Sequence, residues 1–360
     1  MANKTARLGD LATYINGYAF KPADWGDTGL PIIRIQDLNG NSYQLNRYDG
    51  EYPERIEVND GDVLISWSAS LGVYVWQRGK ALLNQHIFKV VFDKLPVNKE
   101  YFVFAVEHKL AEMESKTHGA TMKHIVKKDF DGTTIPYPHI EKQAEIADHL
   151  RRITSLIDRQ AEQLLLLDQL VKSRFIELFG DYDLTHPQES WATIKEVGTV
   201  VGGATPKTDH DEYWGGSYRW ITPAELDADS GYIYDSVRKL TKAGVESCSL
   251  QEMPVGTVIL SSRAPIGKVA IAGNTFYCNQ GFKNIICKEG ITPRYLYTVL
   301  LLNVEYLNSL GRGATFKEIS KGIVESIRIP VPSMELQEQF AAFVEQTDKS
   351  KLCGKMEVAA

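Results

Sequence analysis

The chain has 360 residues, of which 43% are hydrophobic and 24% charged, and a net charge of -6 at pH 7. This is the composition of an ordinary globular protein with about two domains. No apolar run reaches membrane-spanning length, and the first ten residues lack the apolar core of a signal peptide. The four cysteines form no C-x-x-C pair. We therefore expect a cytoplasmic protein with reduced thiols and no membrane contact. The negative charge gives no support to a protein whose whole surface binds nucleic acid, so DNA binding would need basic residues concentrated on one face.

In chain order, residues 1–138 form the first predicted domain. A short helical segment at residues 7–21 opens it. Several segments follow in which β-branched or aromatic residues alternate with polar ones between Gly, Asp, Asn and Pro, which is the pattern of strands. Residues 96–115 are predicted to form the one long helix of the domain. This order of elements predicts an α+β domain with a twisted, mainly antiparallel sheet.

The next segment, residues 139–181, is predicted to form a single long helix. Pro138 precedes it, Gly180 ends it, and no Gly or Pro lies between them. About forty residues at 1.5 Å each make a rod of roughly 60 Å. An apolar stripe along one side of this rod requires a partner helix. The stripe consists of Ile146, Leu150, Ile153, Ile157, Leu164, Leu167, Val171, Phe175 and Leu178.

Residues 182–332 form a second domain, and from residue 191 onward it repeats the first. Five sequence blocks recur in one order, displaced by roughly 190 residues, and the second copy has its own long helical segment. Such ordered recurrence indicates an internal duplication. The clearest matches are Gly61, Ser66 and Gly72 with Gly256, Ser261 and Gly267, Asn84-Gln85 with Asn279-Gln280, and Gly119, Ala120, Thr121 and Lys123 with Gly313, Ala314, Thr315 and Lys317.

Residues 333–360 begin a second copy of the long helix, with Gln337 at the position of Gln143. The apolar stripe of this copy stops near Val344, and a small, polar tail follows. We therefore expect a truncated second helix, which leaves the distal stripe of the first helix without an intramolecular partner. An exposed leucine-rich face of that size predicts self-association of the isolated chain.

The sequence lacks the usual signatures of catalysis. It contains no G-x-x-x-x-G-K-[ST] phosphate loop, no G-x-S-x-G nucleophile elbow and no His or Cys pair at metal-ligand spacing. An E-x-K triplet at residues 114–116 resembles that of some nucleases, but nothing else in the sequence supports it. We predict that this chain has no catalytic residue, no metal site and no cofactor of its own.

Binding to DNA fits the repeated motifs better. In GATMK and GATFK, Gly permits close backbone approach, Thr can donate to a phosphate and Lys supplies charge, although a tight turn with a solvated Lys is the alternative. The two Asn-Gln pairs either read adenine edges or cap buried strands. The loops between the shared blocks differ in polar, aromatic and basic residues, as expected for two readers of different targets. The candidate DNA-binding residues are Lys21, Arg34, Trp67, Gln85, Thr121, Lys123, Lys207, Arg263, Lys268, Gln280, Arg312, Thr315 and Lys317.

Two diverged repeats, the GAT-(M/F)-K turns, the I-P-(Y/V)-P-x-x-E-x-Q motifs and a long helix between the repeats resemble the specificity (S) subunit of type I restriction–modification systems. The resemblance covers roughly residues 5–345. It implies two target-recognition domains that read the halves of a bipartite double-stranded DNA target. It also implies spacer helices that pack as an antiparallel coiled coil and hold the methyltransferase (M) subunits, which the restriction (R) subunit then joins. S-adenosylmethionine, ATP and Mg²⁺ belong to these partners. The residues expected on the spacer helices and their docking face are Gln143, Ile146, Leu150, Ile153, Ile157, Leu164, Leu167, Val171 and Gln337.

Two other interpretations remain open on the sequence alone. The short second helix is compatible with a truncated or defective adaptor that binds methyltransferase subunits without productive DNA targeting. Sequence-specific DNA binding by the assembled complex would separate that adaptor from a specificity subunit. An enzyme in its own right, such as a nuclease, would show activity as the purified chain alone.

Overall fold

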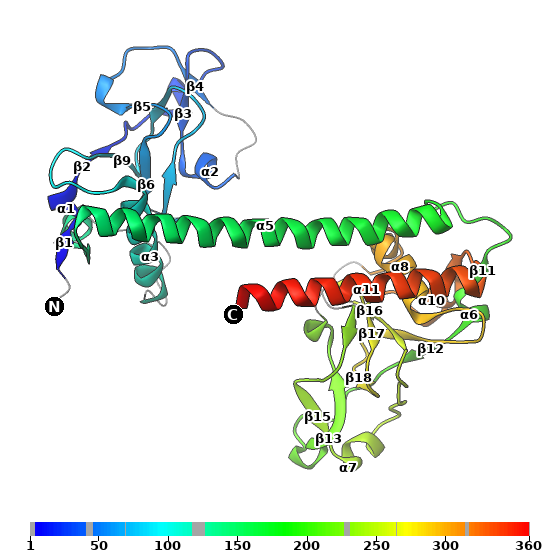
Figure 1. Cartoon of the computed structure of the whole chain (residues 1–360). Coiled ribbons are helices and arrows are strands. Elements are labelled where there is room, and N and C mark those ends of the chain that lie inside the picture. Colours follow the sequence, from blue (N-terminus) through cyan, green and yellow to red (C-terminus); the bar gives the residue numbers. More distant parts are fainter. Residues whose placement is uncertain are drawn as a thin grey trace. The chain divides into compact units, whose positions relative to one another are not determined.

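The computed structural model describes residues 4–40, 46–68, 70–116, 127–226, 231–263, 265–313 and 317–359. The chain divides into two compact units, Met1–Asp158 and Arg159–Ala360. The boundary falls inside one continuous helix, α5 (Ile140–Phe179), drawn in green in Figure 1. No helix among the described residues combines the length and the apolar character needed to cross a lipid bilayer.

The first unit is an α+β domain followed by the first part of α5. In chain order its other elements are β1 (Thr5–Arg7), α1 (Leu8–Leu11), β2 (Thr13–Asn16), η1 (Pro22–Asp24), β3 (Leu30–Ile33), α2 (Ile35–Leu38), β4 (Arg47–Tyr48), η2 (Glu54–Ile56), β5 (Glu57–Val58), β6 (Val63–Ser66), β7 (Gly72–Val75), β8 (Ala81–Leu83), β9 (Ile87–Val91), α3 (Lys99–Lys116), α4 (Lys127–Gly132) and β10 (Thr134–Pro136). The main sheet has the order β2-β9-β6-β7 and is antiparallel. A second sheet has the order β4-β3-β8-β5, and β1 pairs with β10.

The second unit contains the rest of α5 and another α+β domain. Its other elements are β11 (Ala192–Thr193), α6 (Ile194–Val197), β12 (Gly198–Gly202), η3 (Asp211–Tyr213), β13 (Trp214–Ile221), η4 (Pro223–Glu225), β14 (Tyr232–Ile233), β15 (Arg238–Leu240), α7 (Lys242–Glu246), β16 (Val258–Ser262), β17 (Ile266–Ala272), β18 (Tyr277–Cys278), β19 (Lys283–Cys287), α8 (Pro293–Leu302), α9 (Val304–Ser309), α10 (Lys321–Ser326), β20 (Arg328–Ile329) and α11 (Met334–Ala359). The main sheet has the order β12-β19-β16-β17-β14. A smaller sheet has the order β15-β13-β18, and β11 pairs with β20.

The sheet topology confirms the predicted duplication. The order β12-β19-β16-β17 repeats β2-β9-β6-β7, and the antiparallel pair β11–β20 repeats β1–β10. In each smaller sheet one pair is parallel, β3 with β8 and β13 with β18. The predicted fold class, two repeated α+β domains with mainly antiparallel sheets and long helices, is therefore confirmed.

Helix α5 begins and ends where its flanking residues require. Pro138 lies just before the helix, and there is no Pro inside it to remove a backbone donor. At the other end Gly180 has φ +88° and its N–H donates to the carbonyl of Ile176 (2.8 Å), a left-handed helix end that favours glycine.

Three predicted helices differ from the structure. The helical segment that opens each domain is one turn, α1 or α6, because the alternating residues after it pair as strands with β9 and β19. The long helix of the second domain is divided into α8 and α9 at Asn303. The amide of Asn303 donates to Val299 O (2.9 Å) and its side-chain oxygen accepts the N–H of Leu184 (3.4 Å), so this residue serves both the helix end and the chain after α5.

The largest core of the second unit joins the main sheet to α8, α11 and the end of α5. Phe175 lies 5.3 Å from the ring of Phe340 and 5.7 Å from the ring of Tyr295. Further along, Lys351 of α11 pairs with Asp168 of α5. Because higher numbers on α11 meet lower numbers on α5, the two helices run antiparallel here.

The expectation that α5 lacks an intramolecular partner is wrong at its C-terminal end. Phe175 is buried there, and Val171 and Leu178 pack against the same core. The expected polar tail is also wrong, since α11 continues to Ala359 and is 26 residues long, against 40 for α5. A single glycine, here at position 354, costs a helix interior only about 1 kcal/mol relative to alanine, so it does not by itself end the helix.

Candidate nucleic-acid interface

In the first unit, segments far apart in the sequence meet at the ends of their strands. The N–H of Asn84 donates to the carbonyl of Ile33 (3.1 Å) at the end of β3, and a bridge joins Asn84 to Tyr18. The N–H of Trp67, after β6, donates to the carbonyl of His86 (3.2 Å). We define the first strand-end cluster as Tyr18, Arg34, Trp67, Gln85 and His86.

The second unit repeats this arrangement at equivalent positions. The N–H of Asn279 donates to Ile221 O (3.1 Å), and the N–H of Ser262 donates to Gly281 O (2.8 Å). Each bond has its counterpart in the first unit. We define the second strand-end cluster as Thr205, Thr222, Arg263, Gln280 and Gly281.

A glycine in each unit, Gly17 or Gly203, allows the loop after the first strand of the main sheet to lie close to the Asn-Gln turn. A Cβ on Gly17 would lie 2.0 Å from Asn84 O, and a Cβ on Gly203 would lie 2.3 Å from Asn279 O. No other residue fits at either position without moving the backbone. The loops that carry Lys21 and Lys207 are thereby held against the two Asn-Gln turns.

The asparagine and glutamine of each pair have different roles. The side-chain oxygen of Asn84 accepts the N–H of Gln85 (2.9 Å), and that of Asn279 accepts the N–H of Gly281 (2.8 Å). The asparagines therefore stabilise the turns at the strand ends. For these two residues this agrees with the alternative in which the Asn-Gln pairs cap buried strands. Gln85 and Gln280 are exposed, and Gln280 accepts a hydrogen bond from the hydroxyl of Thr205.

An acidic residue organises the turn after β3 and after β13. Asp37 accepts the N–H of Arg34 (2.7 Å), and Glu225 accepts the N–H of Thr222 (2.9 Å). The guanidinium of Arg34 lies 3.6 Å from the Asp37 carboxylate and 5.5 Å from the ring centre of Trp25. The Asp37 carboxylate and the Trp25 ring thus hold the Arg34 guanidinium in place, and Asp37 partly neutralises its charge.

The residues that flank the GATFK motif contact a strand end of the second unit. Arg312 and Glu318 exchange two backbone hydrogen bonds (3.1 and 3.0 Å), and the N–H of Ile319 donates to Ser262 O (3.0 Å). Glu318 also pairs with Lys283 (3.1 Å). Thr315, and in the first repeat Thr121 and Lys123, lie outside the described residues.

The remaining candidate DNA-binding residues differ in their exposure and in whether they already form bonds within the fold. The ammonium group of Lys268 donates to the carbonyls of Pro223 (3.2 Å) and Leu226 (3.0 Å), so it is already used inside the fold. Trp67 stacks on Phe88, with ring centres 5.5 Å apart, and is half-buried. The exposed basic candidates are Lys21, Lys207, Arg312 and Lys317, and Arg263 is half-buried.

The sequence prediction missed His86. Its φ of +71° is uncommon for a residue with a side chain and costs of order 1–3 kcal/mol. The conformation places the imidazole 5.0 Å from the ring of Trp67. The second repeat has Gly281 at this position, and this difference between the repeats was the available signal. The exposed aromatic residues Tyr18 and Trp25 were also missed.

The helix residues expected to dock a partner fall into two groups. Ile153 and Ile157 are exposed, as are four leucines that the prediction missed, and these six side chains are 47–61% exposed. Ile146, Leu150, Leu164 and Leu167 are half-buried. Gln143 and Gln337 are fully buried, so the expectation that they face a partner is wrong. The four leucines are Leu156, Leu165, Leu166 and Leu170.

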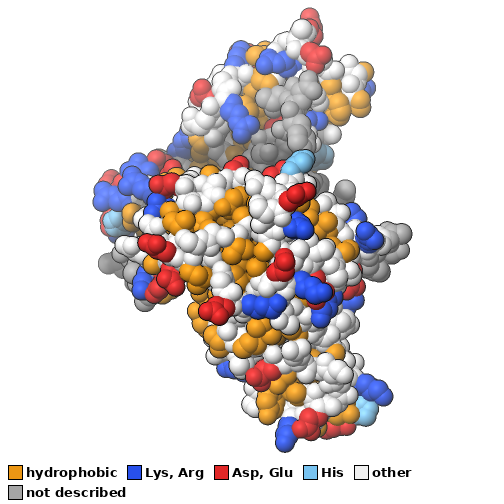
Figure 2. All heavy atoms as spheres, turned by 90° about the vertical axis from the view of Figure 1, so that its right-hand side faces the viewer, with side chains coloured by type: hydrophobic (Ala, Val, Ile, Leu, Met, Phe, Trp, Pro, Cys, Tyr) orange, Lys and Arg blue, Asp and Glu red, His pale blue; other side chains and the backbone are white. Residues whose placement is uncertain are grey.

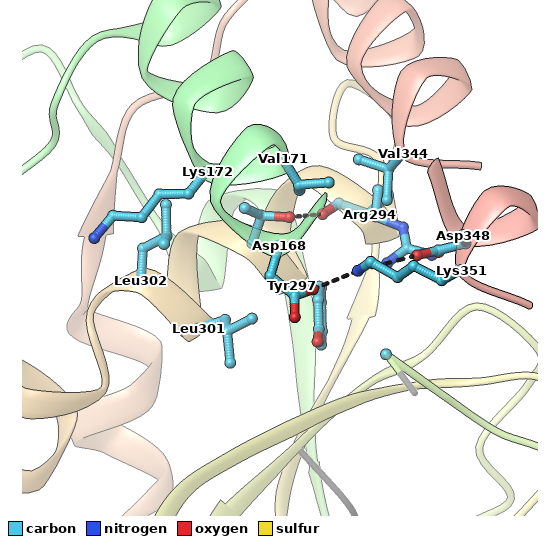
Figure 3. Close-up of a pocket in the computed structure, with 12 residues that line it drawn as sticks. Asp168, Val171, Lys172, Arg294, Tyr297, Leu301, Leu302, Val344, Asp348 and Lys351 are labelled. Carbon is cyan, nitrogen blue, oxygen red and sulfur yellow. Dashed lines mark hydrogen bonds and ion pairs between the residues drawn. The ribbon is translucent and has the colours of Figure 1, made fainter. Parts of the chain in front are cut away.

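A cavity of about 210 Å³ in the second unit is lined by charged residues of α5, α8 and α11 (Figure 3). Lys351 pairs with Asp168 and lies 3.8 Å from Asp348, which pairs with Arg294 (3.2 Å). The guanidinium of Arg294 also lies 4.7 Å from the ring centre of Tyr232. These four charged side chains pair with one another. We therefore interpret them as holding α5, α8 and α11 together, and we do not interpret the cavity as a ligand site.

The described residues give no support for catalysis. They contain no group of three His, Cys, Asp or Glu placed to hold a metal ion. Burial raises the pKa of the Cys278 thiol and of the Cys287 thiol to about 12, so neither is a thiolate nucleophile at neutral pH. On the face in Figure 2, Lys and Arg side chains are interspersed with Asp, Glu and apolar ones.

Comparison with known proteins gives a consistent result. The model of the family described as "Type I restriction modification DNA specificity domain" matches residues 2–166 and 188–354. The type I restriction enzyme MjaIX specificity subunit of Methanocaldococcus jannaschii is 42% identical over 185 residues, which are 50% of this chain and 43% of that protein. The chain thus spans less than half of that relative. The MjaVIII specificity subunit of the same organism is 24% identical over 96% of this chain and 86% of its own length.

The fold of the whole chain also has a solved counterpart. The S subunit of a type I restriction–modification system from M. genitalium superposes with a TM-score of 0.60 at 14% identity, covering 99% of this chain and 92% of that one. The family match covers both units and most of the residues in each. This chain therefore belongs to the type I restriction–modification DNA specificity family.

Proposed function

We propose that this chain is the DNA-specificity subunit of a type I restriction–modification complex and recognises a bipartite double-stranded DNA target. Residues 1–138 and 182–332 are the two target-recognition domains, and α5 and α11 form the spacer. The observation that carries the proposal is the pair of strand-end clusters. Equivalent backbone hydrogen bonds hold unlike side chains in the two units, as two readers of different base sequences require.

The candidate residues divide into those suited to contact bases and those suited to contact phosphates. The amides of Gln85 and Gln280 can each form two hydrogen bonds with an adenine edge, and the guanidinium of Arg263 can do so with guanine. Lys21, Lys207, Arg312 and Lys317 are exposed cations suited to phosphate contacts. We assign the same phosphate role to Thr121, Lys123 and Thr315 from the sequence motif alone.

In this proposal the chain performs no catalysis and works in the cytoplasm with methyltransferase and restriction subunits. S-adenosylmethionine, ATP and Mg²⁺ belong to those partners. The exposed apolar residues of α5 support a docking role, since water-exposed leucines on one helix favour burial against another protein. A net charge of -6 is compatible with DNA binding if partner subunits supply much of the contact with the DNA backbone.

Mapping of methylated DNA in cells with and without this chain tests the proposal. We expect one bipartite sequence with a fixed gap to be methylated only when the chain is present together with its methyltransferase subunits. An assembled complex that methylates no defined sequence would instead support the adaptor interpretation. Cleavage of DNA by the purified chain alone would show that it is an enzyme.

A further inference from the structure

The junction between the first domain and α5 contains a fully buried glutamine. The side-chain oxygen of Gln143 accepts the N–H of Asn98 (2.9 Å), and its amide donates to the carbonyl of Pro138 (2.8 Å). Asn98 is the residue that caps the start of α3, because its own side chain accepts the N–H of Tyr101 (2.9 Å). Gln143, near the start of α5, thus joins that helix to the start of α3.

The second domain uses the same bonds between equivalent residues. The side-chain oxygen of Gln337 accepts the N–H of Thr292 (2.8 Å), and its amide donates to the carbonyls of Pro332 (2.9 Å) and Gly290 (3.1 Å). Thr292 in turn caps α8. The bonded residues are 45 positions apart in both domains.

A tyrosine adds a second point of attachment in each domain. The hydroxyl of Tyr101 donates to Pro136 O (2.8 Å), and the hydroxyl of Tyr295 donates to Pro330 O (3.0 Å), with a separation of 35 residues in both cases. Burial raises the pKa of both hydroxyls, so both remain protonated donors at neutral pH. We define the first clamp as Tyr101 and Gln143, and the second clamp as Tyr295 and Gln337.

The length of α5 makes its starting angle important. A helix of 40 residues is roughly 60 Å long, so a rotation of about 3° at its first turn displaces the far end by about 3 Å. One base-pair step of DNA is about 3.4 Å. This displacement is sideways, across the helix axis, and is comparable with one base-pair step. An angular error of a few degrees therefore misaligns one domain with its half-site at the natural gap.

We propose that the two clamps are positioning devices that fix the angle at which each long helix leaves its domain, and thereby restrict the complex to one gap length. This inference rests on the proposed function. The clamp residues are buried at the junctions between the domains and their helices, so they do not contact DNA directly. Their effect is on the distance between the half-sites and not on the bases that each domain reads.

Methylation of a DNA library by the assembled complex tests this proposal. The library carries both half-sites with gaps one and two base pairs shorter and longer than the natural gap. For Gln143→Met, which keeps the size of the side chain but removes both hydrogen bonds, we expect about tenfold more methylation at neighbouring gaps relative to the natural gap.

Two further variants keep the test decisive. Gln169→Met changes an exposed glutamine of the same helix and should leave the gap preference unchanged. Tyr101→Phe removes only a hydroxyl, should also relax the gap, and decides the matter if Gln143→Met fails to fold or assemble. A purely structural role would lower methylation equally at every gap length, and that result would overturn the proposal. If the unaltered chain supports no bipartite methylation at all, the proposed function fails instead.

Discussion

A chain in which residues 157–163 are duplicated should methylate the same two half-sites with a gap about three base pairs longer. Seven added helical residues lengthen α5 by about 10.5 Å and rotate its end by only about 20° relative to two full turns. The duplicated residues lie before the part of α5 that packs against α11, where Phe175 meets Phe340. The core of the second unit is therefore left intact.

Sequencing of the methylated sites measures both the gap and the half-sites. A matched control replaces Arg159, Gln160 and Glu162 by alanine without changing the helix length, and it should keep the natural gap. If the duplicated chain is active with an unaltered gap, α5 does not set the distance between the half-sites. If the half-sites themselves change, the helix contributes to base recognition, which contradicts the assigned division of roles.

Replacement of Leu156, Leu165 and Leu166 by glutamine should abolish self-association of the isolated chain and strongly weaken its assembly with methyltransferase subunits. All three side chains are more than half exposed in the chain alone. Burial of a leucine stabilises a complex by about 1.5–3 kcal/mol. Loss of three such contacts predicts a decrease in affinity on the order of a thousandfold.

Light scattering measures the self-association, and titration with purified methyltransferase subunits measures the assembly. The control variant carries Val237→Gln and Val255→Gln, which remove comparably exposed apolar side chains outside α5. It should behave as the unaltered chain does. A triple-leucine variant that assembles with unchanged affinity would show that these exposed leucines of α5 do not form the docking surface.

The features that could be predicted from the sequence are those with a local signal. The long helix follows from the spacing of its apolar residues between Pro138 and Gly180, and the duplication follows from the recurrence of blocks such as GATMK and GATFK. The end of α11 could not be predicted in this way. Its last turns lack an apolar stripe, and ion pairs with other elements, such as Lys351 with Asp168, help to hold it.

The strand-end clusters depend on contacts that no single stretch of sequence encodes. Arg34, Trp67 and Gln85 were each chosen as separate candidates, whereas the pairing of β3 with β8 and the bonds after β6 bring them together. The left-handed conformation of His86 is likewise a property of the folded turn. The role of Gln143 was misjudged because the motif indicates a helix start but not the buried N–H that the glutamine bonds.

In the proposed function, each of the two repeated domains reads one half of the target. A chain in which residues 191–332 also replace residues 7–138 tests it most directly, by mapping of the DNA that its complex methylates. We expect a target in which both half-sites are the one read by the natural second domain. Continued methylation of the natural first half-site would contradict it.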